Sequence, residues 1–461
     1  MSARKQAPVI EGEVLWRDDP GYEHAWAGAL WNRVKPRRYP EVIVRAASER
    51  DVPAAVDLAR ARGMRIAMRA GGHSWCGSPL RDGGMLLDLS QLRRWDIDAA
   101  SATATVQPGV IGSELATELT RRELAFPAGH CATVALGGYL LSGGLGWNSG
   151  LWGPACASVE EIEAVTAVGE TVRCNPDEHP DLFWAARGAG PGFFAAVTAF
   201  RLRLYPRPSS VASTKYVLPM ADTAAAVRWA VDAAHRLPPN VELSFFLGTA
   251  DPPLASGRPA PKAVTISATA FSDTGREAAA ALEPLRDCPF ASRALSRQIA
   301  EPTPLDTLYG AASDAWPAEH RYAADTLWSD APYETLLTEL AGVIEAAPSD
   351  KALVLAPVAP VGRKRELTAD MAFSALGESY VVPYAVWDDP AEDEANISWL
   401  RETMRAIEPL GTGHYIAETD LSADPSRARR SYTAEDWERL QKVRAGYDPQ
   451  GVFHSYLTPD A

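Results

Sequence analysis

The spacing of apolar residues predicts alternating short strands and helices in the first half of the chain. Strands are expected at Tyr39–Arg45 and Arg65–Arg69. Between them, apolar residues recur three and four positions apart, as in a helix that buries one face and ends at Gly63. Further elements are two strands at Met85–Leu89 and Ala102–Val106 and a helix at Ile111–Glu123. The pattern therefore begins as a strand–helix–strand unit.

The pattern changes after a stretch rich in proline and serine, Pro206–Ser210, which marks a candidate domain boundary. Before it lie an expected hairpin, a short helix and a strand, at Val159–Thr171, Pro180–Arg187 and Ala195–Tyr205. Beyond it, strands alternate with longer helices. The strands are Val241–Leu247 and Ala263–Ala270, and the helices are Thr223–Leu237, Gly275–Leu285 and Tyr333–Ala346. This second region predicts a sheet covered by helices on one side.

Composition narrows the class of protein. With 461 residues, 46% of them hydrophobic, the chain is long enough for two or three globular domains. A net charge of -14 argues against nucleic acid and anionic membranes as partners. No apolar run reaches the length that spans a bilayer, and no secretory signal is visible. Five scattered cysteines favour a reduced, cytoplasmic setting, and the absence of CxxC or HxxxH pairs predicts no metal site.

Two glycine-rich turns carry the candidate chemistry. One, Arg69–Ser74, directly follows an expected strand, where open sheets place ligands. The other runs from Gly129 to Gly146. Glycine tolerates the backbone conformations that aim amides at a phosphate. The candidate cofactor-binding residues are Arg69, Ala70, Gly71, Gly72, His73, Ser74, Gly129, Cys131, Val134, Gly137, Gly138, Ser142, Gly143, Gly146 and Val197.

Four motifs in order give the chain a family resemblance. They are the two turns at 69–74 and 129–146, Pro180–Gly188 and Asp448–Phe453. Together they resemble the berberine bridge enzyme-like branch of the vanillyl-alcohol oxidase flavoprotein superfamily. The resemblance implies an α+β fold with a PCMH-type FAD-binding domain in two parts, residues 1–206 and 421–461. It also implies a substrate-binding domain, residues 207–420, built on an antiparallel sheet backed by helices.

The resemblance also implies how the cofactor is held. In this family a histidine at the position of His73 is bound to the flavin 8α-methyl carbon. In one subset a cysteine at the position of Cys131 is bound to flavin C6, so the chain is expected to carry FAD bicovalently. The alternative is that Cys131 is a plain buried thiol. Two electron-withdrawing attachments would raise the reduction potential of the flavin and favour hydride uptake.

A base must take the proton of the substrate heteroatom. The segment His414–Asp420 resembles the family pattern Tyr-x-Asn-x-x-Asp, whose tyrosine is often that base, with Ala417 in place of the asparagine. Tyr415 is therefore the candidate catalytic residue. The alternative is a strand tyrosine with a capped hydroxyl. Glu418 would point away from Tyr415 in a strand and is expected to be solvated.

Two further segments, Met371–Glu378 and Tyr380–Trp387, are expected to roof the flavin. Alternation places Tyr380, Val382 and Tyr384 on one face. The candidate substrate-binding residues are Phe373, Tyr384 and Glu418, whereas Trp387 is expected in the core.

The function implied is an FAD-dependent oxidase that takes a hydride from a CH–OH or CH–NH group of a small organic substrate. O₂ would then reoxidise the flavin and give H₂O₂. Ala417 and the apolar segment Val381–Trp387 favour a hydrophobic or aromatic natural product. Three alternatives stay open: a sugar or oligosaccharide oxidase, a dehydrogenase with another electron acceptor, and a flavoprotein without catalysis.

Overall fold

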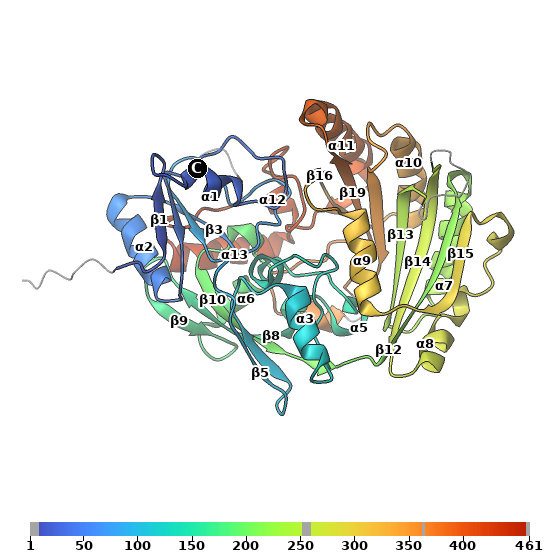
Figure 1. The fold of residues 1–461 in the computed structure, drawn as a ribbon, viewed down its shortest axis with the longest axis horizontal. Helices are drawn as coiled ribbons and strands as arrows, with labels where there is room; N and C mark the ends of the chain where they lie inside the picture. Colours follow the sequence, from blue (N-terminus) through green and yellow to red (C-terminus); the bar gives the residue numbers. More distant parts are fainter. Residues whose placement is uncertain (1–8, 251–259, 362–364, 458–461) are drawn as a thin grey trace, which may run out of the picture.

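The protein folds into two lobes (Figure 1). The computed structural model describes residues 9–250, 260–361 and 365–457. The first lobe holds residues 9–206 together with the C-terminal helices, and the second holds one large sheet. Among the described helices, none is both long and apolar enough to cross a bilayer.

The expected strand–helix–strand unit lies in the first lobe. Four strands form a sheet in the order β1-β2-β4-β3, in which β2 and β3 run parallel to β4. These strands are β1 Glu13–Trp16, β2 Val42–Arg45, β3 Ile66–Arg69 and β4 Met85–Asp88; the helices are α1 Tyr22–Ala27 and α2 Asp51–Arg62. Gly63 ends α2 with a φ of 64°, a left-handed conformation in which glycine meets no steric penalty.

A second sheet of the first lobe has five antiparallel strands in the order β5-β6-β10-β8-β9. These are β5 Trp95–Asp98, β6 Thr103–Val106, β8 Val159–Val165, β9 Thr171–Cys174 and β10 Ala196–Arg203. Around it lie α3 Gly112–Thr120, α4 Leu136–Leu141, α5 Ser149–Trp152, α6 Pro180–Ala186 and the short pair β7 Leu124–Ala125 and β11 Tyr205–Pro206. The expected hairpin is the pair β8 and β9.

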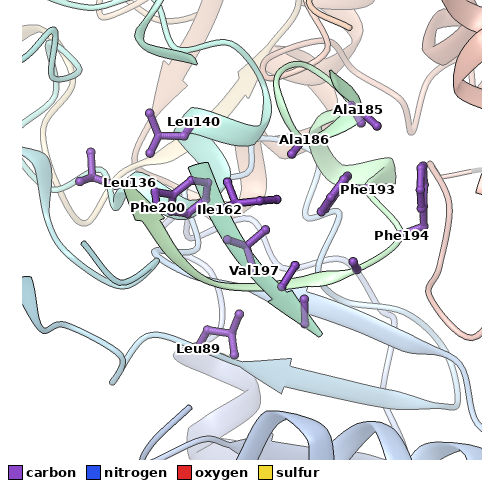
Figure 2. Packing of buried hydrophobic residues seen from close by; sticks show 14 of the residues in the cluster. Leu89, Leu136, Leu140, Ile162, Ala185, Ala186, Phe193, Phe194, Val197 and Phe200 are labelled. Carbon is purple, nitrogen blue, oxygen red and sulfur yellow. The ribbon is translucent and has the colours of Figure 1, made fainter. Parts of the chain in front are cut away.

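The core of the first lobe joins residues far apart in the sequence. Figure 2 shows Ile162, Val197 and Phe200 packed beneath Leu136 and Leu140 of α4. Burial of each large apolar side chain contributes roughly 1.5–3 kcal/mol to folding. The C-terminal segment completes this core: Phe453 pairs with Ile66, and α13 Ala434–Tyr447 packs against α6, with α12 Arg427–Arg430 before it. The second glycine turn, which contains α4, therefore packs directly on this core.

The second lobe is built on a nine-stranded antiparallel sheet, in the order β15-β12-β14-β13-β18-β19-β17-β20, with β16 also paired to β19. Its strands are β12 Ser210–Pro219, β13 Val241–Thr249, β14 Lys262–Ser272, β15 Ser296–Pro302, β16 Arg321–Ala324, β17 Leu327–Ser329, β18 Leu353–Val358, β19 Ser379–Trp387 and β20 Gly411–Gly413. Its helices are α7 Thr223–Ala234, α8 Gly275–Ala281, α9 Leu305–Ala315, α10 Tyr333–Glu345 and α11 Asp393–Ile407.

Alternation along β13 shows which face is covered. Val241, Leu243, Phe245 and Leu247 pack into the core shared with α7 and α10, while Glu242 and Ser244 face the other way, into a cavity. This confirms the expected α+β fold with an antiparallel sheet backed by helices. Trp387 lies in the core, as expected. The segment Met371–Glu378 forms no strand, and the apolar pattern does not predict α9.

Candidate active site

A cavity of about 1160 Å³ extends from the glycine turns to the uncovered face of the nine-stranded sheet. Pockets for small ligands usually measure roughly 300–1,000 Å³. The cavity is therefore large enough for a dinucleotide together with a second small molecule. Its walls come from both lobes, as is typical of an active site between domains.

The two candidate nucleophiles lie in one wall of this cavity, joined by Thr133. The Thr133 hydroxyl lies 2.9 Å from Nε2 of His73 and 3.6 Å from Sγ of Cys131. Both side chains line the cavity. The structure thus brings together two residues that are 58 positions apart in the sequence, as expected if both meet one group.

His73 is held as a neutral imidazole. Its ring stacks on Trp31 at a centroid distance of 4.7 Å. Burial, with a smaller contribution from the positive charge of Arg69, lowers the pKa of His73 to about 4. A neutral imidazole keeps a lone pair available for bonding to carbon. The guanidinium of Arg69 is held by other groups of the protein. It donates hydrogen bonds to both carboxylate oxygens of Asp88 at 2.8 Å and to the carbonyl of Ala29.

The glycines of the two turns leave room for a ligand. A Cβ at Gly138 would meet nothing within 4 Å and would extend into the cavity. A Cβ at Gly71 would lie 2.7 Å from Cβ of Ala135, so glycine lets the first turn pack against the second. Gly72 has a φ of 79°, which an L-residue rarely adopts. These features fit a flavin dinucleotide held against bare backbone.

Of the fifteen candidate cofactor-binding residues, fourteen line the cavity. Gly143 is the exception. It has a φ of 118°, and a Cβ there would lie 2.4 Å from the Phe373 ring, which packs directly against it. Gly143 therefore serves packing behind the cavity wall. The same contact corrects the expectation for Phe373, which is buried between Gly143 and Tyr415 and does not line the cavity.

Tyr415 and Glu418 lie on a turn and not on a strand. The amides of Glu418 and Thr419 both donate to the carbonyl of Tyr415 at 3.1 Å, which curls the segment. Both side chains consequently line the cavity, and the expectation that Glu418 is solvated and points away from Tyr415 is wrong. Glu418 is partly buried, and burial raises the pKa of its carboxyl group.

The Tyr415 phenol is buried at the cavity wall, with 5% of the residue exposed. Its oxygen accepts a hydrogen bond of 2.9 Å from the Gly144 amide. Burial raises the pKa of the Tyr415 phenol above its ordinary value of 10, and the nearby charge of Glu418 raises it further by a smaller amount. A phenol that stays protonated at neutral pH donates a hydrogen bond more readily than it accepts a proton. The role of Tyr415 as a base stays a prediction.

Tyr415→Phe separates these two roles. Loss of one hydrogen bond to substrate should slow flavin reduction by about tenfold or less, because such a bond contributes roughly 0.5–1.5 kcal/mol. Loss of a general base should slow it by about 10²–10⁴-fold and remove a limb of the pH profile. We expect the smaller effect in anaerobic stopped-flow reduction. A rate of flavin reduction lowered more than a hundredfold would show that Tyr415 is the base.

The cavity also contains aromatic residues that the sequence patterns did not single out. Trp75 follows the first turn directly, and its ring lies 5.7 Å from Tyr384, edge to face. Trp316, just after α9, lies 5.4 Å from the same tyrosine. Tyr384 lines the cavity, as expected, and so does Tyr380. Proximity to the turn could have identified Trp75, but nothing local identifies Trp316.

Comparison with known proteins defines the class. Residues 40–175 match the family model described as an FAD binding domain. The chain is 31% identical over 452 residues to the FAD-linked oxidoreductase nodO of Hypoxylon pulicicidum, covering 97% of this chain and 98% of that one. This chain therefore belongs to the FAD-linked oxidoreductases.

Solved structures agree on the fold. That of 6-hydroxy-D-nicotine oxidase from Arthrobacter nicotinovorans aligns with a TM-score of 0.83, at 24% identity and 99% coverage of both chains. Berberine bridge enzyme from Eschscholzia californica aligns with a TM-score of 0.81, at 20% identity and coverage of 97% of this chain and 96% of that one. The fold is thus the berberine bridge enzyme-like one. The cofactor is FAD, as the match to the FAD binding domain and to the FAD-linked oxidoreductases shows.

Proposed function

We propose that this FAD-linked oxidoreductase is an oxidase with bicovalently attached FAD, acting on a CH–OH or CH–NH group of a small hydrophobic or aromatic substrate. The observation that carries the proposal is the placement of His73 and Cys131 on either side of Thr133 in one cavity wall. Either residue alone could form one covalent bond to the flavin. Because both residues face the same space, they support two covalent bonds to one flavin.

The side chains have distinct roles in this proposal. Bound FAD supplies a hydride acceptor. His73 and Cys131 hold the cofactor, and the glycine turns admit it close to the backbone. The Tyr415 hydroxyl orients the substrate heteroatom by donating a hydrogen bond. Tyr384, Trp75 and Trp316 enclose the substrate and exclude water from the reacting carbon.

The aromatic wall supports a hydrophobic or aromatic substrate, since large rings bury apolar surface efficiently. One observation favours the alternative of a sugar oxidase. Hydroxyl groups from three neighbouring strands, at Ser213, Ser244 and Ser267, line the far end of the cavity. Serine hydroxyls can form hydrogen bonds with the hydroxyl groups of a sugar.

The cytoplasmic location stays a prediction.

Reoxidation by O₂ tests the oxidase proposal. The holoenzyme is reduced photochemically without air and mixed with air-saturated buffer in a stopped-flow instrument. We expect reoxidation within seconds, with one H₂O₂ formed per flavin. Reoxidation that takes many minutes would instead show a dehydrogenase with another acceptor.

A panel of aromatic alcohols, amines and oligosaccharides then tests the substrate. We expect flavin reduction by an aromatic alcohol or amine. Reduction by oligosaccharides alone would favour the sugar oxidase.

A further inference from the structure

The carboxylate of Glu418 lines the cavity. It accepts hydrogen bonds from the hydroxyls of Tyr380 at 3.3 Å and of Tyr384 at 3.3 and 3.4 Å. Within the described ranges, none of the ion pairs formed by lysine, arginine or histidine includes Glu418. His130, whose charge would stabilise the anion from further away, directs its ring nitrogen at Glu242, 3.4 Å away.

Such an arrangement is costly unless something compensates the charge. A buried carboxylate loses its hydration, and neutral hydroxyl donors return only part of that free energy. Burial accordingly raises the pKa of Glu418, while hydrogen bonds from Tyr384, Tyr380 and Trp75 lower it by less. A positively charged group bound in the cavity would stabilise the Glu418 carboxylate.

The rings around Glu418 suit a cation as well. Tyr384 contacts both Trp75 and Trp316, at centroid distances of 5.7 and 5.4 Å, with interplanar angles of 76° in each case. Trp75 also lies 5.2 Å from Tyr322. Indole and phenol faces attract ammonium groups. Three electron-rich rings, those of Tyr380, Tyr384 and Trp75, thus lie beside the Glu418 carboxylate and line the cavity with it.

We infer that Glu418, Tyr380, Tyr384 and Trp75 form a binding site for a cationic nitrogen, so that the substrate is an organic cation with an aromatic or apolar body. The inference rests on the proposed function, because the site belongs to the substrate cavity. It selects amines over alcohols and sugars. Glu418 acts here in binding and needs no part in proton transfer.

Calorimetric titration of the FAD-loaded enzyme tests the site with two probes of similar shape. Benzyltrimethylammonium carries the positive charge, and benzyl alcohol is neutral. We expect the wild-type protein to bind the cation at least about tenfold more tightly than the alcohol. In Glu418→Gln the preference should fall to about twofold or less, because the amide keeps the shape and loses the charge.

A matched control separates this site from the general charge of the cavity. Asp314 is exposed on α9 and lines the same cavity. Asp314→Asn removes one negative charge and should leave the preference unchanged. The flavin absorbance of each variant verifies that it is folded and loaded.

Two results would overturn the inference. One is a wild-type protein that binds the alcohol as tightly as the cation or binds neither. The other is a cation preference that survives in Glu418→Gln. Neither result bears on reoxidation by O₂, so failure of the cation site and failure of the oxidase proposal are distinguishable.

Discussion

The double variant His73→Ala/Cys131→Ser should release all of its FAD on acid precipitation, leaving a colourless pellet and a yellow supernatant. Wild-type protein should keep the flavin in the pellet. The reason is geometric: Thr133 lies within 2.9 Å of the imidazole and 3.6 Å of the thiol, so both nucleophiles face one space. The measurement is the flavin absorbance of pellet and supernatant.

The two single variants separate the attachments. His73→Ala and Cys131→Ser should each retain flavin in the pellet through the remaining residue, with different absorption maxima. Cys156→Ser is a matched control, because that thiol is buried, has a pKa raised by burial to about 12, and does not line the cavity. Complete release from the Cys131→Ser variant, or none from His73→Ala/Cys131→Ser, would contradict the bicovalent proposal.

Asp325→Ala should lower the free energy of unfolding by about 3–5 kcal/mol, the range found when one partner of a buried ion pair is removed. Asp325 is 1% exposed and pairs with Arg427, which is 6% exposed. The same carboxylate accepts hydrogen bonds from the Thr419 hydroxyl and the Asp420 amide at 2.9 and 3.1 Å. Without it, Arg427 stays buried with less compensation, and the turn that bears Glu418 loses two of its bonds.

Urea denaturation followed by fluorescence measures this effect. The control is Glu334→Ala, which breaks the exposed pair with Arg228 and should change the midpoint very little. Asp325→Asn keeps an acceptor for Thr419 and should fall between the two. A loss below about 1 kcal/mol in Asp325→Ala would mean that Arg427 finds compensation elsewhere, such as Glu408 at 3.4 Å.

The sequence predicts those parts of the site whose geometry is local. The turn Arg69–Ser74 follows a strand whose apolar pattern is plain, and its glycines signal backbone that must approach a ligand. The family motifs predict that His73 and Cys131 lie in the same cavity wall. Fourteen of the fifteen residues that the motifs mark as cofactor-binding line the cavity, and their contact with the cofactor stays a prediction.

The sequence does not predict side-chain positions that are fixed by contacts between residues far apart in the chain. Glu418 faces the cavity because Asp325, about ninety positions earlier, holds the following residues in a turn. Phe373 lies behind the wall because Gly143 lets its ring approach. Trp316 joins the aromatic wall through the placement of α9, a helix that the apolar pattern does not predict. No local pattern encodes such contacts between segments far apart in the chain.

Peptide mass spectrometry of the acid-denatured wild-type protein tests the central claim most directly. If FAD is attached twice, digestion should yield one cross-linked species that contains the His73 peptide, the Cys131 peptide and the mass of one FAD. Unmodified His73 and Cys131 peptides, with all of the FAD recovered free in solution, would contradict the claim.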